Sequence, residues 1–304
     1  MSTVTVIEPR EVPLGGLRAM NVRRTLPSRG RTMVGAWCFL DHYGPDDVED
    51  TGGMVVSAHP HTGLQTVSWL FSGEIEHRDS AGHRAIVRPG EVNLMTAGRG
   101  ISHTEVSTRG TTSLHGAQLW VALPDSSRSV EPGFEHYAAP PVHGEGWSAR
   151  VFLGSVLGDA SPVETHTPLL GAEITLAEGT TLEIPVDPSY EHAVLVDTGA
   201  LTLDDTSVKP SQLAFVPVGS DRLVLHASDE TRLLLLGGTP LGERIVMWWN
   251  FVGRDHDEIA EYRRQWQALL AGEDQDRFAL PDDDRYPEIP APELPRGVRL
   301  TPRV

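Results

Sequence analysis

The sequence has only one cysteine, few cationic side chains and no long hydrophobic run. Cys38 alone cannot form an internal disulfide, and it excludes a metal site built from several cysteines. No apolar run approaches the ~18 residues that a membrane-spanning helix requires. The first residues also lack the basic-then-apolar pattern of a secretion signal. These absences predict a cytoplasmic protein that makes no contact with a membrane.

Lysine and arginine together number 25, against 42 aspartates and glutamates, so the formal net charge is −17. A surface with this excess of negative charge repels the phosphates of nucleic acids, so no direct nucleic-acid binding is expected. The 304 residues are enough for about two domains at ~150 residues each. An apolar fraction of 39% is ordinary for a globular protein.

The 30 glycines and 23 prolines divide the chain into short apolar segments separated by turns. The first half contains predicted strands at Thr66–Phe71, Arg84–Val87, Glu91–Met95 and Ser113–Leu123. The second half contains predicted strands at Val151–Leu157, Glu173–Ile174, Thr181–Pro185, His192–Asp197, Ala200–Leu203, Gln212–Val216, Arg222–His226 and Thr231–Leu236. This spacing favours an all-β fold of antiparallel sandwiches or barrels. Trp69–Gly73 and Leu195–Gly199 are similar, which indicates two copies of one β-unit.

The predicted domains are residues 1–131 and 147–271, joined by a linker at 132–146 that holds three prolines and three glycines. One helix is expected near the end of the second domain, with Asp255 as its N-cap, Glu258 completing a capping box and Gly272 ending it. Its apolar face should pack on a barrel or across the domain interface. Residues 272–304 form an acidic tail with six prolines, predicted to be either an extended strap or disordered.

Two short motifs could bind a metal. His59 and His61 are two residues apart, and so are His103 and Glu105. On a β-strand such pairs point to the same face, so all four side chains could converge inside a barrel. Three imidazoles and one carboxylate suit a divalent transition metal such as Fe(II), Mn, Co, Ni, Cu or Zn, and leave positions open for substrate.

Chance must be weighed against this interpretation. With 13 histidines in the chain, about half an occurrence of His-x-His is expected at random. His-x-Glu also occurs at His143/Glu145, in the predicted linker, and at His256/Glu258, at the predicted helix start. Only His103/Glu105 follows a strand-like segment in the same repeat as His59. Spacing alone therefore leaves open both a metal site and ordinary hydrogen-bonded histidines.

Longer motifs carry a specific resemblance. The segments HPHTGLQTVSWLFSGEIEHRDSAGH, RPGEVNLMTAGRGISHTEVS and LHGAQLWVALP closely resemble the pirin family of bicupins. Two further segments resemble the N-terminal and C-terminal signatures of the family: FLDHYGPDD near residue 40, and PLGERIVMWWNFVGRDHDEI from Pro240 to Ile259. The resemblance implies two stacked, jelly-roll-like cupin β-barrels with a C-terminal helix. It also implies one metal, usually iron, in the N-terminal barrel, held by residues matching His59, His61, His103 and Glu105.

The resemblance further implies an Fe(II)-dependent dioxygenase that opens a flavonol-like aromatic substrate with O₂ and loss of carbon monoxide. Glu105 would then also act as the catalytic proton acceptor. An alternative is a non-enzymatic, metal-containing regulatory module that acts as a transcriptional co-regulator or binds a metabolic enzyme. A third is a purely structural bicupin. A monomer is expected in each case.

Several other residues have simpler interpretations. Gln65 stands where the general cupin motif has a glutamate, and an amide cannot supply charge. The second barrel should hold no metal, because its histidines are isolated. The residues expected to be structural or exposed are His192 and His226 (single polar residues), His115 (a hydrogen-bonded strand histidine), His77 and His83 (solvent-facing beside a turn), Trp248 and Trp249 (packing) and Cys38 (buried).

Overall fold

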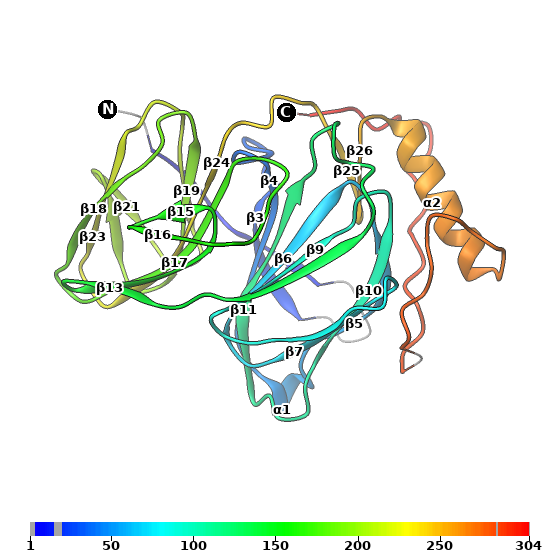
Figure 1. Cartoon of the computed structure of the whole chain (residues 1–304), viewed down its shortest axis with the longest axis horizontal. Helices are drawn as coiled ribbons and strands as arrows, with labels where there is room; N and C mark the ends of the chain where they lie inside the picture. The colour runs from blue at the N-terminus through cyan, green and yellow to red at the C-terminus, as the bar shows by residue number, and fades with distance from the viewer. Residues whose placement is uncertain (1–3, 15–19, 284, 304) are drawn as a thin grey trace.

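Two β-barrels lie side by side, and a helix covers the outer end of the first (Figure 1). The computed structural model describes residues 4–14, 20–283 and 285–303. In Figure 1 the second barrel is on the left, the first is in the middle and helix α2 (His256–Leu270) is on the right. The expected fold class, two stacked barrels with a C-terminal helix, is confirmed.

Each barrel has a seven-stranded and a four-stranded antiparallel sheet. The first barrel consists, in sheet order, of β12 (Gly133–Ala138), β9 (Glu91–Thr96), β6 (Leu64–Ser72), β11 (Ser113–Ala122), β4 (Trp37–Asp47), β3 (Asn21–Leu26) and β2 (Arg10–Pro13), and of β5 (Val55–His61), β10 (Ile101–Ser107), β7 (Ile75–Asp79) and β8 (Arg84–Val87). The second consists of β1 (Thr5–Ile7), β22 (Leu213–Val216), β19 (Glu191–Thr198), β24 (Thr231–Gly238), β17 (Leu169–Leu176), β14 (Trp147–Leu153) and β13 (Val142–Gly144), and of β18 (Thr181–Pro185), β23 (Arg222–Ala227), β20 (Leu201–Leu203) and β21 (Thr206–Val208). The remaining elements are the pairs β15 (Ser155–Val156)/β16 (Asp159–Ala160) and β25 (Val246–Trp248)/β26 (Phe251–Gly253), and the short helix α1 (Val48–Thr51).

Strand position explains the pattern of burial. In β18 buried and exposed residues alternate, because one face covers the second barrel's core and the other meets solvent. In β6 all residues but the last are buried, because its inner face lines the first barrel and its outer face packs on the second. Trp69 on β6 stacks on Phe152 of the second barrel with ring centroids 4.5 Å apart, and its Nε1 donates to Glu173 at 2.7 Å.

A polar cluster also crosses the junction of the barrels. His42 Nε2 and His115 Nε2 lie 2.7 and 2.6 Å from Asp197 Oδ1, and Arg232 Nε donates to Asp197 Oδ2 at 2.6 Å. Burial raises the pKa of Asp197, but the hydrogen bonds from His115 and His42 outweigh it and hold that pKa well below its usual range. Burial lowers the pKa of His42. His115 is thus a hydrogen-bonded strand residue, as its sequence context predicted.

This cluster predicts that the protein loses stability in acid. As the pH falls through ~6.5, the unfolded chain protonates His42 before the folded chain does, and near ~3.9 the same holds for Asp197. Since the unfolded state binds more protons in both ranges, the free energy of unfolding should fall with pH. Urea unfolding between pH 7.5 and 5 should show a weaker pH dependence for His42→Gln than for the control His226→Gln, which changes an exposed histidine of the second barrel. Parallel pH profiles for the two variants would contradict this assignment.

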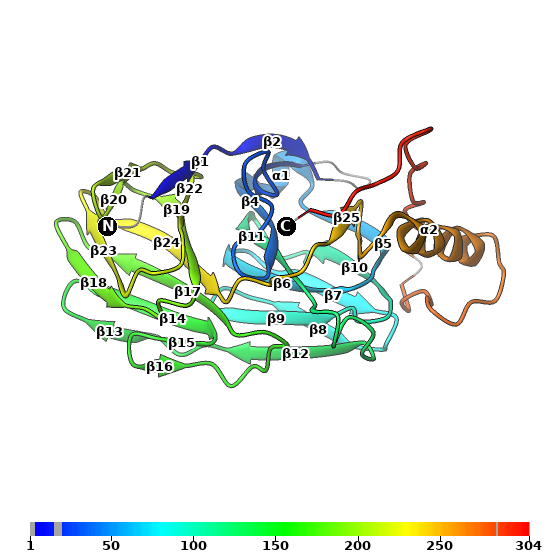
Figure 2. The same cartoon turned by 90° about the horizontal axis from the view of Figure 1, so that it is seen from above.

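The chain does not divide between the barrels at the expected positions. β1, within predicted domain 1–131, pairs with β22 of the second barrel, and Figure 2 shows this segment passing between the barrels. The stretch 132–146, expected to be a linker, contains β12 and β13, which pair with β9 and β14. Its adjacent prolines 140 and 141 fall between these strands, where no backbone donor is needed for a sheet.

Helix α2 begins as predicted. The Asp255 side chain accepts hydrogen bonds from the backbone of Asp257 and Glu258. The Glu258 side chain accepts from the backbone N–H of Arg254 at 2.7 Å, one residue before the cap, so the predicted capping box is not closed on Asp255. Among the residues that the structure describes, neither helix is both long and apolar enough to cross a bilayer.

Of the two predictions for the tail, the strap is confirmed for its described residues. Phe278 is buried against Trp266 of α2. The backbone of Ile289 links two elements, because its N–H donates to Ala58 O on β5 at 2.9 Å while its carbonyl accepts from Trp266 Nε1 at 2.9 Å. Residues far apart in the sequence thus hold the tail along the first barrel (Figure 2).

Candidate metal centre

The centre is built on three neighbouring strands of the first barrel. β10 lies between β5 and β7. In this register His103 is opposite His59 on one side and Asp79 on the other, and Ile101 is opposite His61. Paired residues of adjacent strands point to the same face, so the two motifs and part of β7 face the barrel interior together. A register shift between His103 and Glu105 reflects a bulge beside the site.

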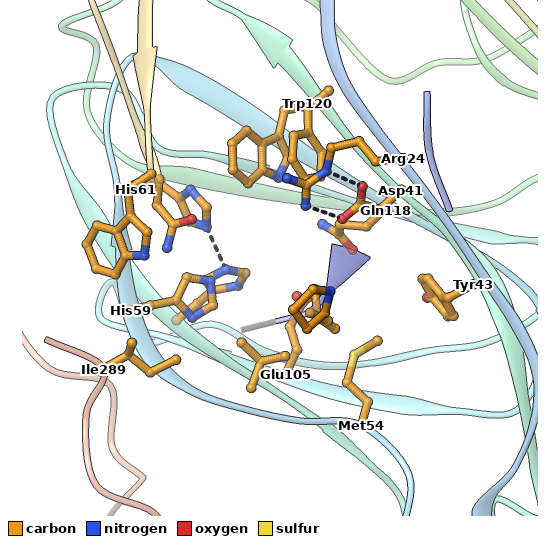
Figure 3. Close-up of a pocket in the computed structure, with 17 residues that line it drawn as sticks. Arg24, Asp41, Tyr43, Met54, His59, His61, Glu105, Gln118, Trp120 and Ile289 are labelled. Carbon is orange, nitrogen blue, oxygen red and sulfur yellow. Dashed lines mark hydrogen bonds and ion pairs between the residues drawn. The ribbon is translucent and has the colours of Figure 1, made fainter. Parts of the chain in front are cut away.

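The three histidines of these motifs converge on one point. His59, His61 and His103 each offer a ring nitrogen, and these nitrogens lie within 4.8 Å of one another. The Nε2 atoms of His61 and His103 are 3.1 Å apart. All three side chains are buried. Figure 3 shows His59 and His61 on one side of a cavity, with Glu105 near its centre in that view.

Burial keeps these imidazoles neutral. It lowers the pKa of His59 to about 4 and holds the pKa values of His61 and His103 well below the usual range. The Nδ1–H of His59 can donate to the backbone oxygen of Ser57 at 2.8 Å, which leaves the Nε2 lone pair free. Neutral imidazoles with converging lone pairs suit a divalent transition metal, so the residues present fit such an ion.

Glu105 lies in the same cavity wall but has different close neighbours. Its carboxylate is within 4.8 Å of ring nitrogens of His77 and His103, and Ser68 Oγ donates to it at 3.1 Å. Burial raises its pKa, although the hydrogen bond from Ser68 acts in the opposite direction. The carboxyl group therefore lies at the cavity, where it can accept and return a proton.

The prediction that His77 faces solvent is wrong. Its side chain is 3% exposed, and its Nδ1 lies 3.3 Å from His103 Nδ1. His83 is 37% exposed and contacts Asp79, so it is only partly open to solvent. The sequence contained a signal for His77, because His77 and Asp79 are two residues apart on a strand, the same spacing as His59 and His61.

Next to the histidines lies a cavity of about 260 Å³ with walls of mixed polarity. Phe39 and Trp120 stack with ring centroids 4.0 Å apart, and they supply an aromatic wall. Arg24 donates two hydrogen bonds to Asp41, at 2.6 and 2.7 Å, and its guanidinium lies 4.3 Å from the centre of the Phe39 ring. Ile289 of the tail also lines the cavity. The cavity can therefore receive a flat aromatic molecule that carries polar groups.

The remaining singled-out residues occupy varied positions. Gln65 donates to Thr96 Oγ1 at 2.9 Å and so joins β6 to β9. Cys38 is buried, as predicted, and burial raises its pKa to about 12.

Trp248 packs with α2 and the tail, whereas Trp249 also lines the cavity, which sequence patterning did not indicate. In the second barrel, His192 is buried and His226 is exposed.

Comparison with known proteins agrees with this architecture. A family model described as Pirin matches residues 18–121, and one described as the pirin C-terminal cupin domain matches residues 171–271. A Pseudomonas aeruginosa protein named "Putative quercetin 2,3-dioxygenase" is 41% identical over 290 residues, covering 95% of this chain and 90% of that protein. A pirin-like protein of Caulobacter vibrioides is 36% identical, covering 95% of this chain and 99% of its own. A crystal structure of a quercetin 2,3-dioxygenase from Acinetobacter baumannii superposes with a TM-score of 0.91 at 37% identity, covering 98% of both chains. The chain belongs to the pirin family.

Proposed function

We propose that the protein is a metal-dependent dioxygenase that opens a flavonol-like aromatic substrate with O₂. The proposal depends on one observation above all: three buried, neutral imidazoles converge beside a cavity with an aromatic wall. His59, His61, His103 and Glu105 would hold one divalent transition metal, for which Fe(II) is our choice. The names of the relatives from Pseudomonas aeruginosa and Acinetobacter baumannii support the same activity.

Different residues at the site would have different roles in the reaction. When bound, the metal would lower the pKa of a coordinating substrate hydroxyl and make the resulting anion reactive toward O₂. The stacked pair of Phe39 and Trp120 would form one wall against the aromatic substrate and orient it. Glu105 would accept the hydroxyl proton at a carboxylate oxygen, and the Ser68 hydroxyl would hold that carboxylate in place. The tail and barrel walls would exclude bulk water from the reacting anion.

The test is an aerobic assay with Fe(II)-loaded protein and quercetin as the probe. We expect loss of the flavonol absorption, consumption of one O₂ for each flavonol and release of carbon monoxide. Glu105→Gln should lower turnover by about 10²–10⁴-fold, the usual contribution of a positioned acid–base group.

The matched control is Glu145→Gln. Glu145 follows His143 in an identical His-x-Glu spacing but is exposed on the second barrel's edge, so this variant should keep full turnover. Metal-loaded protein that binds quercetin without consuming O₂ would contradict the dioxygenase proposal. The regulatory alternative would then be the better account of the same centre.

A further inference from the structure

A buried chain of hydrogen bonds leads away from the cavity behind His103. His103 Nδ1 lies 3.3 Å from His77 Nδ1, and His77 Nε2 lies 3.2 Å from Asp79 Oδ2. All three side chains are buried. The register of β10 and β7 produces this arrangement, because it pairs His103 with Asp79 and Glu105 with His77.

The chemistry of Asp79 determines which nitrogen donates and which accepts in each of these hydrogen bonds. Both oxygens of the Asp79 side chain face donors, because Oδ1 accepts the backbone N–H groups of Ala81 and His83 at 2.9 and 3.0 Å and Oδ2 lies next to His77 Nε2. An ionised carboxylate can only accept hydrogen bonds, so His77 carries its hydrogen on Nε2 and has its lone pair on Nδ1. That lone pair accepts the Nδ1–H of His103. The lone pair of His103 is then on Nε2, the atom that faces His61 at the cavity.

We propose that Asp79 and His77 are positioning residues that fix the tautomer and ring orientation of His103 for metal binding. The inference rests on the proposed metal centre and adds two residues to it. Partners of this kind, a carboxylate or carbonyl behind a metal-binding histidine, orient the ring and increase its basicity. Here the carboxylate acts through a second imidazole.

Asp79→Asn is the sharpest test because it should reverse the hydrogen bonds among Asp79, His77 and His103 without removing a side chain. Asp79 Oδ1 accepts the backbone N–H groups of Ala81 and His83, at 2.9 and 3.0 Å. The amide oxygen of the variant should keep these two bonds, so its NH₂ group faces His77 Nε2. The hydrogen bonds to His77 and His103 are then reversed. His103 carries its hydrogen on Nε2, so that nitrogen has no lone pair with which to bind the metal.

The measurement is a titration of the metal-free full chain with Co(II), followed by its visible absorption, with the melting temperature recorded for each variant. Asp79→Asn and His77→Leu should weaken Co(II) binding by about 10–100-fold, the usual cost of losing such a partner. His77→Asn should restore most of the affinity, because its amide oxygen can occupy the position of Nδ1 and accept from His103. His83→Leu is the matched control, since His83 contacts the same carboxylate from a partly exposed position. It should bind Co(II) as the parent protein does.

Three outcomes separate this inference from the proposed function. If His103→Ala abolishes Co(II) binding while Asp79→Asn and His77→Leu bind like His83→Leu, the positioning role is wrong and the centre stands. If His77→Asn binds as weakly as His77→Leu, His77 acts through packing and the positioning role is again wrong. If His103→Ala binds Co(II) as the parent protein does, the proposed centre itself is wrong.

Discussion

His103→Ala should lose its metal and its turnover while keeping its fold. Loss of an outer hydrogen-bond partner alone weakens metal binding by about 10–100-fold, so removal of a ligand should cost more than about 100-fold. The effect on folding should be small, about 1 kcal/mol, because the variant loses the hydrogen bond to His77 and the contact with His61 but no large apolar contact. Elemental analysis of protein purified without a histidine tag, together with thermal unfolding, measures both effects.

The control for this prediction is His143→Ala. His143 is exposed on β13, in the second His-x-Glu pair, and its replacement should change neither metal content nor turnover. Retention of metal by His103→Ala would contradict the site. A drop in stability as large as that of a core truncation would contradict the separation between the centre and the barrel core.

Trp69→Ala should give the largest loss of stability, about 3–5 kcal/mol in the free energy of unfolding. Trp69 is fully buried at the junction of the barrels, stacks on Phe152 and donates to Glu173. Burial raises the pKa of Glu173 and the bond from Trp69 lowers it. The variant therefore leaves both a cavity and a poorly solvated carboxyl group. Urea unfolding followed by far-UV circular dichroism measures the change.

Trp69→Phe separates the two contributions. The phenyl ring keeps the contact with Phe152 but cannot donate to Glu173, so we expect about 1–3 kcal/mol, the cost of an unsatisfied buried acceptor. Equal stabilities of Trp69→Ala and the parent protein would show that the junction contributes little to folding. Two separate transitions in the urea unfolding curve would show that the barrels unfold independently.

Much of the fold could be predicted from local patterns. The predicted strand Arg84–Val87 coincides with β8, and Thr66–Phe71 lies within β6, because turn residues and short apolar runs mark these segments directly. The exchange of β1 into the second barrel could not be predicted in this way. Its three residues carry no mark of their partner, and pairing with β22 depends on the assembled barrels.

The candidate site could also be predicted only where local spacing carries the information. His59, His61 and His103 could be predicted because spacing on single strands places them on one face. The role of His77 depends on which strand lies beside β10, and the adjacent turn suggested exposure instead. The contribution of Ile289 to the cavity depends on a tail whose proline-rich composition does not specify where it docks. The junction residues His42, His115 and Asp197 come from both barrels, so no local pattern joins them.

The docked tail is fixed in place and lines the cavity through different atoms of the same residue. Ile289 is held on β5 and α2 through its main-chain atoms, so the hydrogen bonds that seat it do not depend on its side chain. That side chain, in contrast, faces the cavity. Substitutions at this position can reshape the chamber while β5 and β10, which carry the three converging histidines, stay unaltered.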